Sequence, residues 1–169
     1  MTRQFRQIPR VLRKEDVTLI IDSNEQLPLP LKGYKTKTHG LQTGDYSIEG
    51  LEELVTIERK SLHDLIGCVG HGRDRFEREL HRMRGFDFAA VVVESYWFDL
   101  MEGDWRGKIT VAQALGSILG WTANGTNFIF AGSRDHADLI VRGLLWHYAK
   151  QTHEKMCWLK DYKKEKDGK

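Results

Sequence analysis

The chain has 169 residues, 40% of them hydrophobic and 30% charged, with a formal net charge of +2. This length favours one domain, and the composition excludes a disordered chain. No apolar run approaches the roughly 20 residues of a bilayer span, so no membrane association is expected. Cys68 and Cys157 lie far apart in no metal-ligand spacing, which argues against a disulfide scaffold and a zinc finger. Residues 1–14 lack the apolar stretch of a signal peptide, so a cytoplasmic location is expected.

The first half of the chain predicts short strands separated by turns. Residues 17–21 are a β-branched run that ends at Asp22. Alternating lysines and threonines predict a second strand over residues 34–39. Two more strands are expected over residues 46–48 and 54–57, joined by an acidic turn. The strands therefore cluster early, as in a sheet whose first strands are neighbours.

The second half alternates helices with strands. Helices are expected from a Ser61 cap, over residues 73–84, from Thr110 to Asn124-Gly125 and from Ser133 onward, and strands over residues 88–93 and 127–131. Residues 94–108 are expected to be loop-like. This order predicts an α/β fold with three layers, in which helices cover both faces of a sheet. No Gly-rich phosphate loop follows a predicted strand, so no nucleotide cofactor is expected.

The net charge conceals an uneven distribution. Residues 1–14 carry five basic and no acidic residues, and residues 150–169 carry seven lysines against four acids. The two ends together contribute +8, which leaves −6 for residues 15–149. An acidic centre between basic ends fits two interpretations, solvated tails or contact with nucleic acid.

Acidic residues and one lysine stand near the ends of the predicted strands: Asp22, Glu25, Asp45, Glu58 and Lys60. Side chains alternate along a strand, so Glu58 and Lys60 point to the same side. If neighbouring strands pair, Asp45 and Glu58 approach each other, and two such carboxylates repel unless a hard cation lies between them. Lys60 could then orient an attacking water or stabilise charge that develops on a phosphate. A single acid at a strand end is usually only solvent-exposed, whereas this combination is specific.

These residues also match a family motif. The segments Asp22-Ser-Asn-Glu25, Gly44-Asp45 and Glu58-Arg59-Lys60-Ser-Leu-His-Asp64 closely resemble the XPF-type structure-specific endonuclease domain, a branch of the PD-(D/E)xK nuclease superfamily. The resemblance covers about residues 17–150, between a basic N-terminal arm, 1–16, and a basic C-terminal tail, 151–169. It implies a restriction-endonuclease-like fold, in which a central mixed β-sheet is flanked by helices.

The resemblance also implies an activity and a role for each matched residue. The activity is hydrolysis of phosphodiester bonds near flaps, forks or junctions in branched DNA, with Mg²⁺ or Mn²⁺, during DNA repair or recombination. Asp22, Asp45 and Glu58 are expected to bind the metal, Glu25 is an additional acid of the site, and Lys60 is the catalytic lysine. Arg59, Asp64 and Arg73 match the pattern as supporting or DNA-binding residues, and structural roles for them stay open.

Several alternatives remain open from the sequence. Longer relatives carry a helicase or a helix-hairpin-helix domain, for which this chain has no room, so its preferred DNA structure is undecided. The chain could also be a Holliday-junction resolvase of a phage-like element, or a non-catalytic DNA-binding partner that keeps only the fold. The family's nuclease domains commonly dimerise through late helices, which allows a homodimer. The expected location is the nucleoid of a prokaryote or phage host, or a eukaryotic nucleus.

Overall fold

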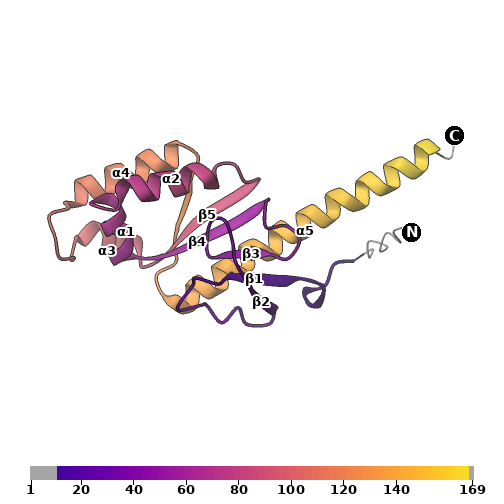
Figure 1. The fold of residues 1–169 in the computed structure, drawn as a ribbon, viewed down its shortest axis with the longest axis horizontal. Helices are drawn as coiled ribbons and strands as arrows, with labels where there is room; N and C mark the ends of the chain where they lie inside the picture. Colours follow the sequence, from indigo (N-terminus) through magenta and orange to yellow (C-terminus); the bar gives the residue numbers. More distant parts are fainter. Residues whose placement is uncertain (1–10, 168–169) are drawn as a thin grey trace.

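A mixed β-sheet forms the centre of the molecule (Figure 1). The computed structural model describes residues 11–167, with side chains through Lys163. The described residues form a six-stranded sheet of order β2-β1-β3-β4-β5-β6. The strands are β1 Thr18–Asp22, β2 Lys35–His39, β3 Tyr46–Ile48, β4 Val55–Ser61, β5 Phe88–Glu94 and β6 Asn127–Phe130. Strand β3 is antiparallel to β1 and β4, and the remaining neighbours are parallel.

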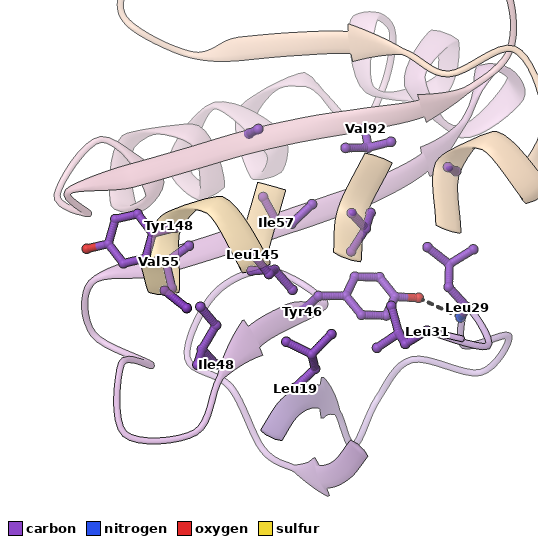
Figure 2. Packing of buried hydrophobic residues seen from close by; sticks show 14 of the residues in the cluster. Leu19, Leu29, Leu31, Tyr46, Ile48, Val55, Ile57, Val92, Leu145 and Tyr148 are labelled. Carbon is purple, nitrogen blue, oxygen red and sulfur yellow. Dashed lines mark hydrogen bonds between the residues drawn. The ribbon is translucent and has the colours of Figure 1, made fainter. Parts of the chain in front are cut away.

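Helices cover both faces of this sheet. They are α1 Leu62–Val69, α2 Arg73–Met83, α3 Trp97–Glu102, α4 Val111–Ala123 and α5 Arg134–Asp167, after a 3₁₀ turn at Lys14–Asp16. One apolar cluster, which includes Val92, joins α5 to the sheet, and Figure 2 shows Leu145 of α5 beside Ile57. The other cluster joins α1, α2 and α4 to Val91 and Val93. The predicted three-layer α/β fold is therefore confirmed.

The alternation of β5 explains why one strand serves both clusters. Its neighbouring residues Val91 and Val92 are both fully buried, and they face opposite layers. Burying one such side chain contributes roughly 1.5–3 kcal/mol. The continuous apolar run of β5 is thus a consequence of its central position between two helical layers.

Two boundaries differ from those expected from the sequence. The stretch 94–108 is not wholly loop-like, because it contains α3. The Asp99 carboxylate accepts the Tyr96 N–H at the start of this helix, and Gly103 ends it with φ of 72°. Strand β4 also continues through Ser61, so Glu58 lies within the strand and not at its end. Pairing with all seven residues of β5 accounts for this extra length.

The long α5 helix passes through residue 150 without a break and extends away from the sheet in Figure 1. Residues 1–10 of the predicted basic arm lie outside the described residues. None of the helices in the described part of the chain is long and apolar enough to cross a membrane.

Candidate active site

The pairing of β3 with β4 brings Asp45 beside Glu58. Tyr46 pairs with Ile57, and the Asp45 backbone N–H donates to the Ile57 carbonyl at 2.8 Å. The Arg59 N–H then donates to Asp45 Oδ2 at 2.7 Å. Gly44 enters this turn with φ of +80°, a conformation that favours glycine. The Gly-Asp sequence therefore has a local reason, since the glycine directs the following carboxylate to the middle of β4.

Burial and mutual repulsion perturb both carboxylates. Burial raises the pKa of Asp45 to about 6, against the opposing effect of the Arg59 N–H, and the nearby charge of Glu25 adds to the increase. Burial also raises the pKa of Glu58 well above its ordinary value, and the charge of Asp45 raises it further. Glu58 is only 5% exposed. Two repelling, poorly hydrated carboxylates are an arrangement that a bound cation would stabilise.

Lys60 lies against Glu58 on the same side of β4. Its Nζ atom donates a hydrogen bond to Glu58 Oε1 and lies 5.0 Å from the centre of the Phe76 ring on α2. Burial acts to lower the pKa of Lys60, but the Glu58 carboxylate outweighs it and the pKa is raised. The lysine therefore keeps its positive charge in a largely enclosed position.

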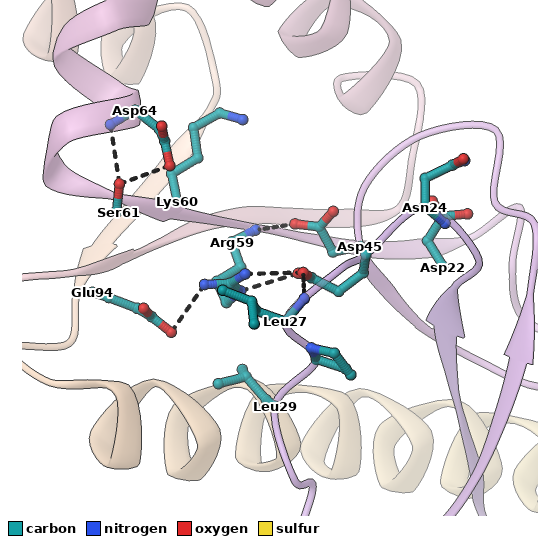
Figure 3. A network of polar contacts seen from close by, with 12 residues as sticks. Asp22, Asn24, Leu27, Leu29, Asp45, Arg59, Lys60, Ser61, Asp64 and Glu94 are labelled. Carbon is teal, nitrogen blue, oxygen red and sulfur yellow. Dashed lines mark hydrogen bonds and ion pairs between the residues drawn. The ribbon is translucent and has the colours of Figure 1, made fainter.

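The opposite side of β4 holds a separate ion-pair network. Figure 3 shows Arg59 and Lys60 projecting to opposite sides of the strand. The Arg59 guanidinium donates from Nε and Nη2 to the Glu25 carboxylate at 3.1 and 3.0 Å, and it lies 3.2 Å from Glu94. Burial acts to raise the pKa of Glu25, but the hydrogen bonds from Arg59 and Leu27, with the charge of Arg59, lower it. Arg59 is thus an ion-pair donor, one of the two roles left open by the sequence.

Asp22 lies at the end of β1 and is tied to the backbone. Its Oδ2 accepts the Asn24 N–H at 3.0 Å and its Oδ1 accepts the Leu41 N–H at 2.7 Å, so it joins two loops. The Asp22 N–H donates to the Asp45 carbonyl at 2.8 Å, so the backbones of these two residues lie side by side where β3 begins. Each Asp22 oxygen retains a lone pair, but its observed contacts position the loops.

Asp64 and Arg73 contact residues other than these acids. Asp64 belongs to the start of α1, where its carboxylate accepts the Ser61 hydroxyl at 2.7 Å. Arg73 begins α2, donates to Ser117 at 2.9 Å, pairs with Glu77 at 2.9 Å and covers the Trp121 ring. Both residues therefore organise helices beside the site.

Asp45 and Glu58 could form part of a divalent-cation site that waters and substrate phosphates complete. Within residues 11–167, no three Asp, Glu, His or Cys side chains converge in an arrangement that could hold a metal ion. Mg²⁺ does not need such a cage, because it is commonly bound by one or two carboxylates together with waters and substrate phosphates. Two repelling carboxylates with raised pKa values match that kind of partial site.

The family model of the ERCC4 domain matches residues 3–140 of the chain. The chain belongs to the ERCC4 domain family. XPF from Aeropyrum pernix has a similar structure, with a TM-score of 0.63 and 17% identity over 78% of this chain and 61% of that one. XPF from Aeropyrum pernix in complex with DNA gives a TM-score of 0.59 and 16% identity over 79% and 66%. A comparison with curated proteins found no match.

These identities are low enough that the two XPF structures establish the fold alone. This ERCC4-domain chain also spans less than two thirds of either of them. Within those limits, the predicted resemblance to the XPF-type nuclease domain is confirmed by the family match and the shared architecture.

Two acids near the candidate site were not among the residues predicted to form it. The charge of Glu79 on α2 raises the pKa of both Glu58 and Lys60. Its signal in the sequence is its position three residues after Phe76, which places it on the helix face beside Lys60. Glu94 ends β5 and pairs with both Arg59 and Arg134 at 3.2 Å. Its only signal in the sequence is its position at the end of the apolar run 88–93, and the parallel register that sets it opposite Ser61 comes from the structure.

Proposed function

We propose that this chain is a divalent-metal-dependent DNA endonuclease that hydrolyses phosphodiester bonds near branch points. The observation that carries the proposal is the juxtaposition of Asp45 and Glu58 with Lys60 on one side of the sheet. The two carboxylates repel each other and are poorly hydrated, and the lysine beside them keeps its charge. Membership of the ERCC4 domain family, and the likeness to XPF solved with DNA, favour nucleic acid as the substrate.

The carboxylates and the lysine would have different roles in hydrolysis. Asp45 and Glu58 would hold Mg²⁺ or Mn²⁺, with Asp22 as the proposed third acid, and the bound ion would supply an activated water and offset phosphate charge. Once Glu58 binds a cation, the Lys60 ammonium is free to donate to a phosphate oxygen and stabilise the charge developing there. Water oxygen bonds to phosphorus, the bond to O3′ breaks, and O3′ takes a proton. The products are 5′-phosphate and 3′-hydroxyl ends.

The ion-pair network on the other side of β4 would keep this arrangement rigid. Arg59 contributes its backbone N–H to Asp45 and its side chain to Glu25 and Glu94, so one residue links the site to β5. A misplacement of about 1 Å in a catalytic group can reduce the rate about 100-fold. We therefore assign Arg59 a positioning role and Glu25 the role of its partner.

The basic ends would add a sequence-independent grip on DNA. The extended part of α5 carries the exposed aromatic rings of Trp158 and Tyr162, which stack on each other with centroids 5.4 Å apart. Lys155 lies three residues before Trp158 and seven before Tyr162 on the same helix face, and Lys163 directly follows Tyr162 in the chain. Lysines interleaved with aromatic rings are typical of surfaces that hold nucleic acid strands.

A panel of DNA substrates tests the proposal. Flap, fork, four-way junction and linear duplex DNA of one sequence are incubated with the protein and EDTA, Mg²⁺ or Mn²⁺. Cleavage of branched substrates with either metal, and none with EDTA, is the expected result. Preferential cutting of the four-way junction would favour a junction resolvase over a flap endonuclease. DNA binding without cleavage of any substrate would refute the catalytic proposal and favour a non-catalytic partner.

A further inference from the structure

A concave surface lies beside α1, and basic side chains line it. It is a cavity of about 360 Å³ between α1 and the loop that connects α3 to α4. Its basic groups are His63 and His71 from the α1 side and Arg106 and Lys108 from the loop. None of the described residues that line this basic cavity is acidic.

One glycine leaves room in the basic cavity, and a second lets the loop pack closely against the end of α1. His63, Ile66, Gly67 and Gly70 follow one another at helical spacings of three, four and seven, so they form one face of α1. A Cβ atom at Gly67 would meet no atom within 4 Å, whereas one at Gly70 would lie 3.4 Å from Ile109 Cδ1. The loop therefore rests on α1 at Gly70 and leaves room at Gly67.

The loop that carries the two permanent cations is anchored at both sides of them. The Trp105 indole N–H donates to the Ile109 carbonyl at 2.9 Å, and both side chains pack against the core beneath α1, α2 and α4. Arg106 and Lys108, between these anchors, are exposed. Neither forms an ion pair within the described part of the chain, in contrast to Arg73, which pairs with Glu77. Two uncompensated cations on a fixed loop favour an anionic ligand.

The basic cavity lies a short distance from the Asp45–Glu58 pair along the chain. Helix α1 follows β4 directly, and His63 is three residues after Lys60. At 1.5 Å per helical residue, Gly67 lies about 7.5 Å along α1 from Leu62. A DNA strand advances about 3.4 Å per nucleotide. Gly67 thus lies roughly two nucleotide spacings from the start of α1, which directly follows β4.

We propose that the basic cavity binds backbone phosphates of the DNA strand, roughly two to four nucleotides from the scissile phosphate. Arg106 and Lys108 neutralise one or two phosphates, and the imidazoles of His63 and His71 donate hydrogen bonds to their oxygens. The inference rests on the proposed function, because it assigns a position on the same substrate. It gives α1 the role of setting how far along the strand the cut falls.

Binding measurements in EDTA test the basic cavity without interference from cleavage. Fluorescence anisotropy with a labelled fork gives Kd at several NaCl concentrations for the wild type, Arg106→Ala/Lys108→Ala, Gly67→Glu and the control Gly67→Ala. The double variant should bind about 5- to 50-fold more weakly, and its plot of log Kd against log salt should flatten by about 0.9 for each phosphate that is no longer neutralised. Gly67→Glu places a carboxylate in the open volume and should weaken binding similarly, whereas Gly67→Ala should bind like the wild type.

A modified substrate locates the bound phosphates. A fork with uncharged methylphosphonate linkages two to four nucleotides from the cut should weaken binding by the wild type and leave the double variant's affinity unchanged. If the wild type binds and cuts DNA but the double variant keeps its affinity and salt slope, the cavity inference is overturned and the proposed function stands. If the wild type neither binds nor cuts DNA, both are overturned. Circular dichroism should match the wild type for each variant and Tm should not fall, because Arg106 and Lys108 are exposed and a Cβ at Gly67 would meet no atom within 4 Å.

Discussion

Removing the Arg59 guanidinium tests how the site is held together. In Arg59→Met the Glu25 carboxylate, whose side chain is only 6% exposed, loses two charge-assisted hydrogen bonds. Glu94 loses one ion pair but keeps Arg134 at 3.2 Å, so most of the cost falls on Glu25. Breaking a buried ion pair by removing one partner costs about 3–5 kcal/mol. The free energy of unfolding should fall by about that amount at pH 7.

The pH dependence distinguishes the loss of an ion pair from a loss of packing. In the wild type the pKa of Glu25 is lowered, so its ionised form contributes stability above its ordinary value of 4.5. That contribution is lost as the pH falls through the lowered pKa. In Arg59→Met burial acts without the guanidinium and should raise the pKa above 4.5. The deficit should therefore be largest at pH 7 and should shrink toward pH 3.5.

Urea unfolding followed by circular dichroism at pH 7, 5.5, 4.5 and 3.5 measures this deficit. Glu25→Gln/Arg59→Met is the matched variant, since it removes the uncompensated charge, and it should recover about 1–2 kcal/mol of the loss at pH 7. A deficit below about 1 kcal/mol at pH 7, or an equal deficit at pH 3.5, would refute the reasoning.

Three further predictions concern the same site and its surroundings. Because the pKa of Asp45 is raised to about 6, ionisation of this carboxyl opposes folding. Asp45→Asn should therefore raise the free energy of unfolding in EDTA at pH 8 by about 1–2 kcal/mol, with no gain below pH 4. An unchanged free energy of unfolding at pH 8, measured by urea titration, would contradict this prediction. A Cβ at Gly44 would lie 2.0 Å from Thr56 Oγ1 at a φ of +80°, so Gly44→Ala should cost more than about 2 kcal/mol by the same assay, and a neutral result would contradict the strained geometry. Deleting residues 1–14 should weaken DNA binding and flatten its dependence on salt, whereas unchanged affinity would show that these residues are only solvated ends.

The sequence predicted the elements whose patterns are set by burial. The apolar run of β5 and the Thr110 cap of α4 were predicted because their signals are local. The proximity of Asp45 and Glu58 followed from the pairing of adjacent strands, which the structure confirms. Helix α3 was missed because it is less than two turns long, and only Asp99 and Gly103 mark its ends.

The sequence could not show which acidic residues from other parts of the chain lie on each side of β4. Arg59 could be assigned to the side opposite Glu58 by alternation, but its partner Glu94 lies 35 residues later in the chain, on another strand. Glu25 sits three residues beyond β1, where no strand period fixes its direction, and the structure turns it toward Arg59. Such contacts depend on sheet order, which local patterns do not specify.

The most direct test of the central claim compares metal-dependent cleavage by the wild type, Asp45→Asn, Glu58→Gln and Lys60→Met on one fork substrate. Single-turnover rates with Mg²⁺ are measured beside binding in EDTA and unfolding by urea. The wild type should cut, and the three variants should bind the fork and fold while cutting at least about 100-fold more slowly. Equal cutting by Asp45→Asn and the wild type would contradict the assignment of this carboxylate pair as the active site.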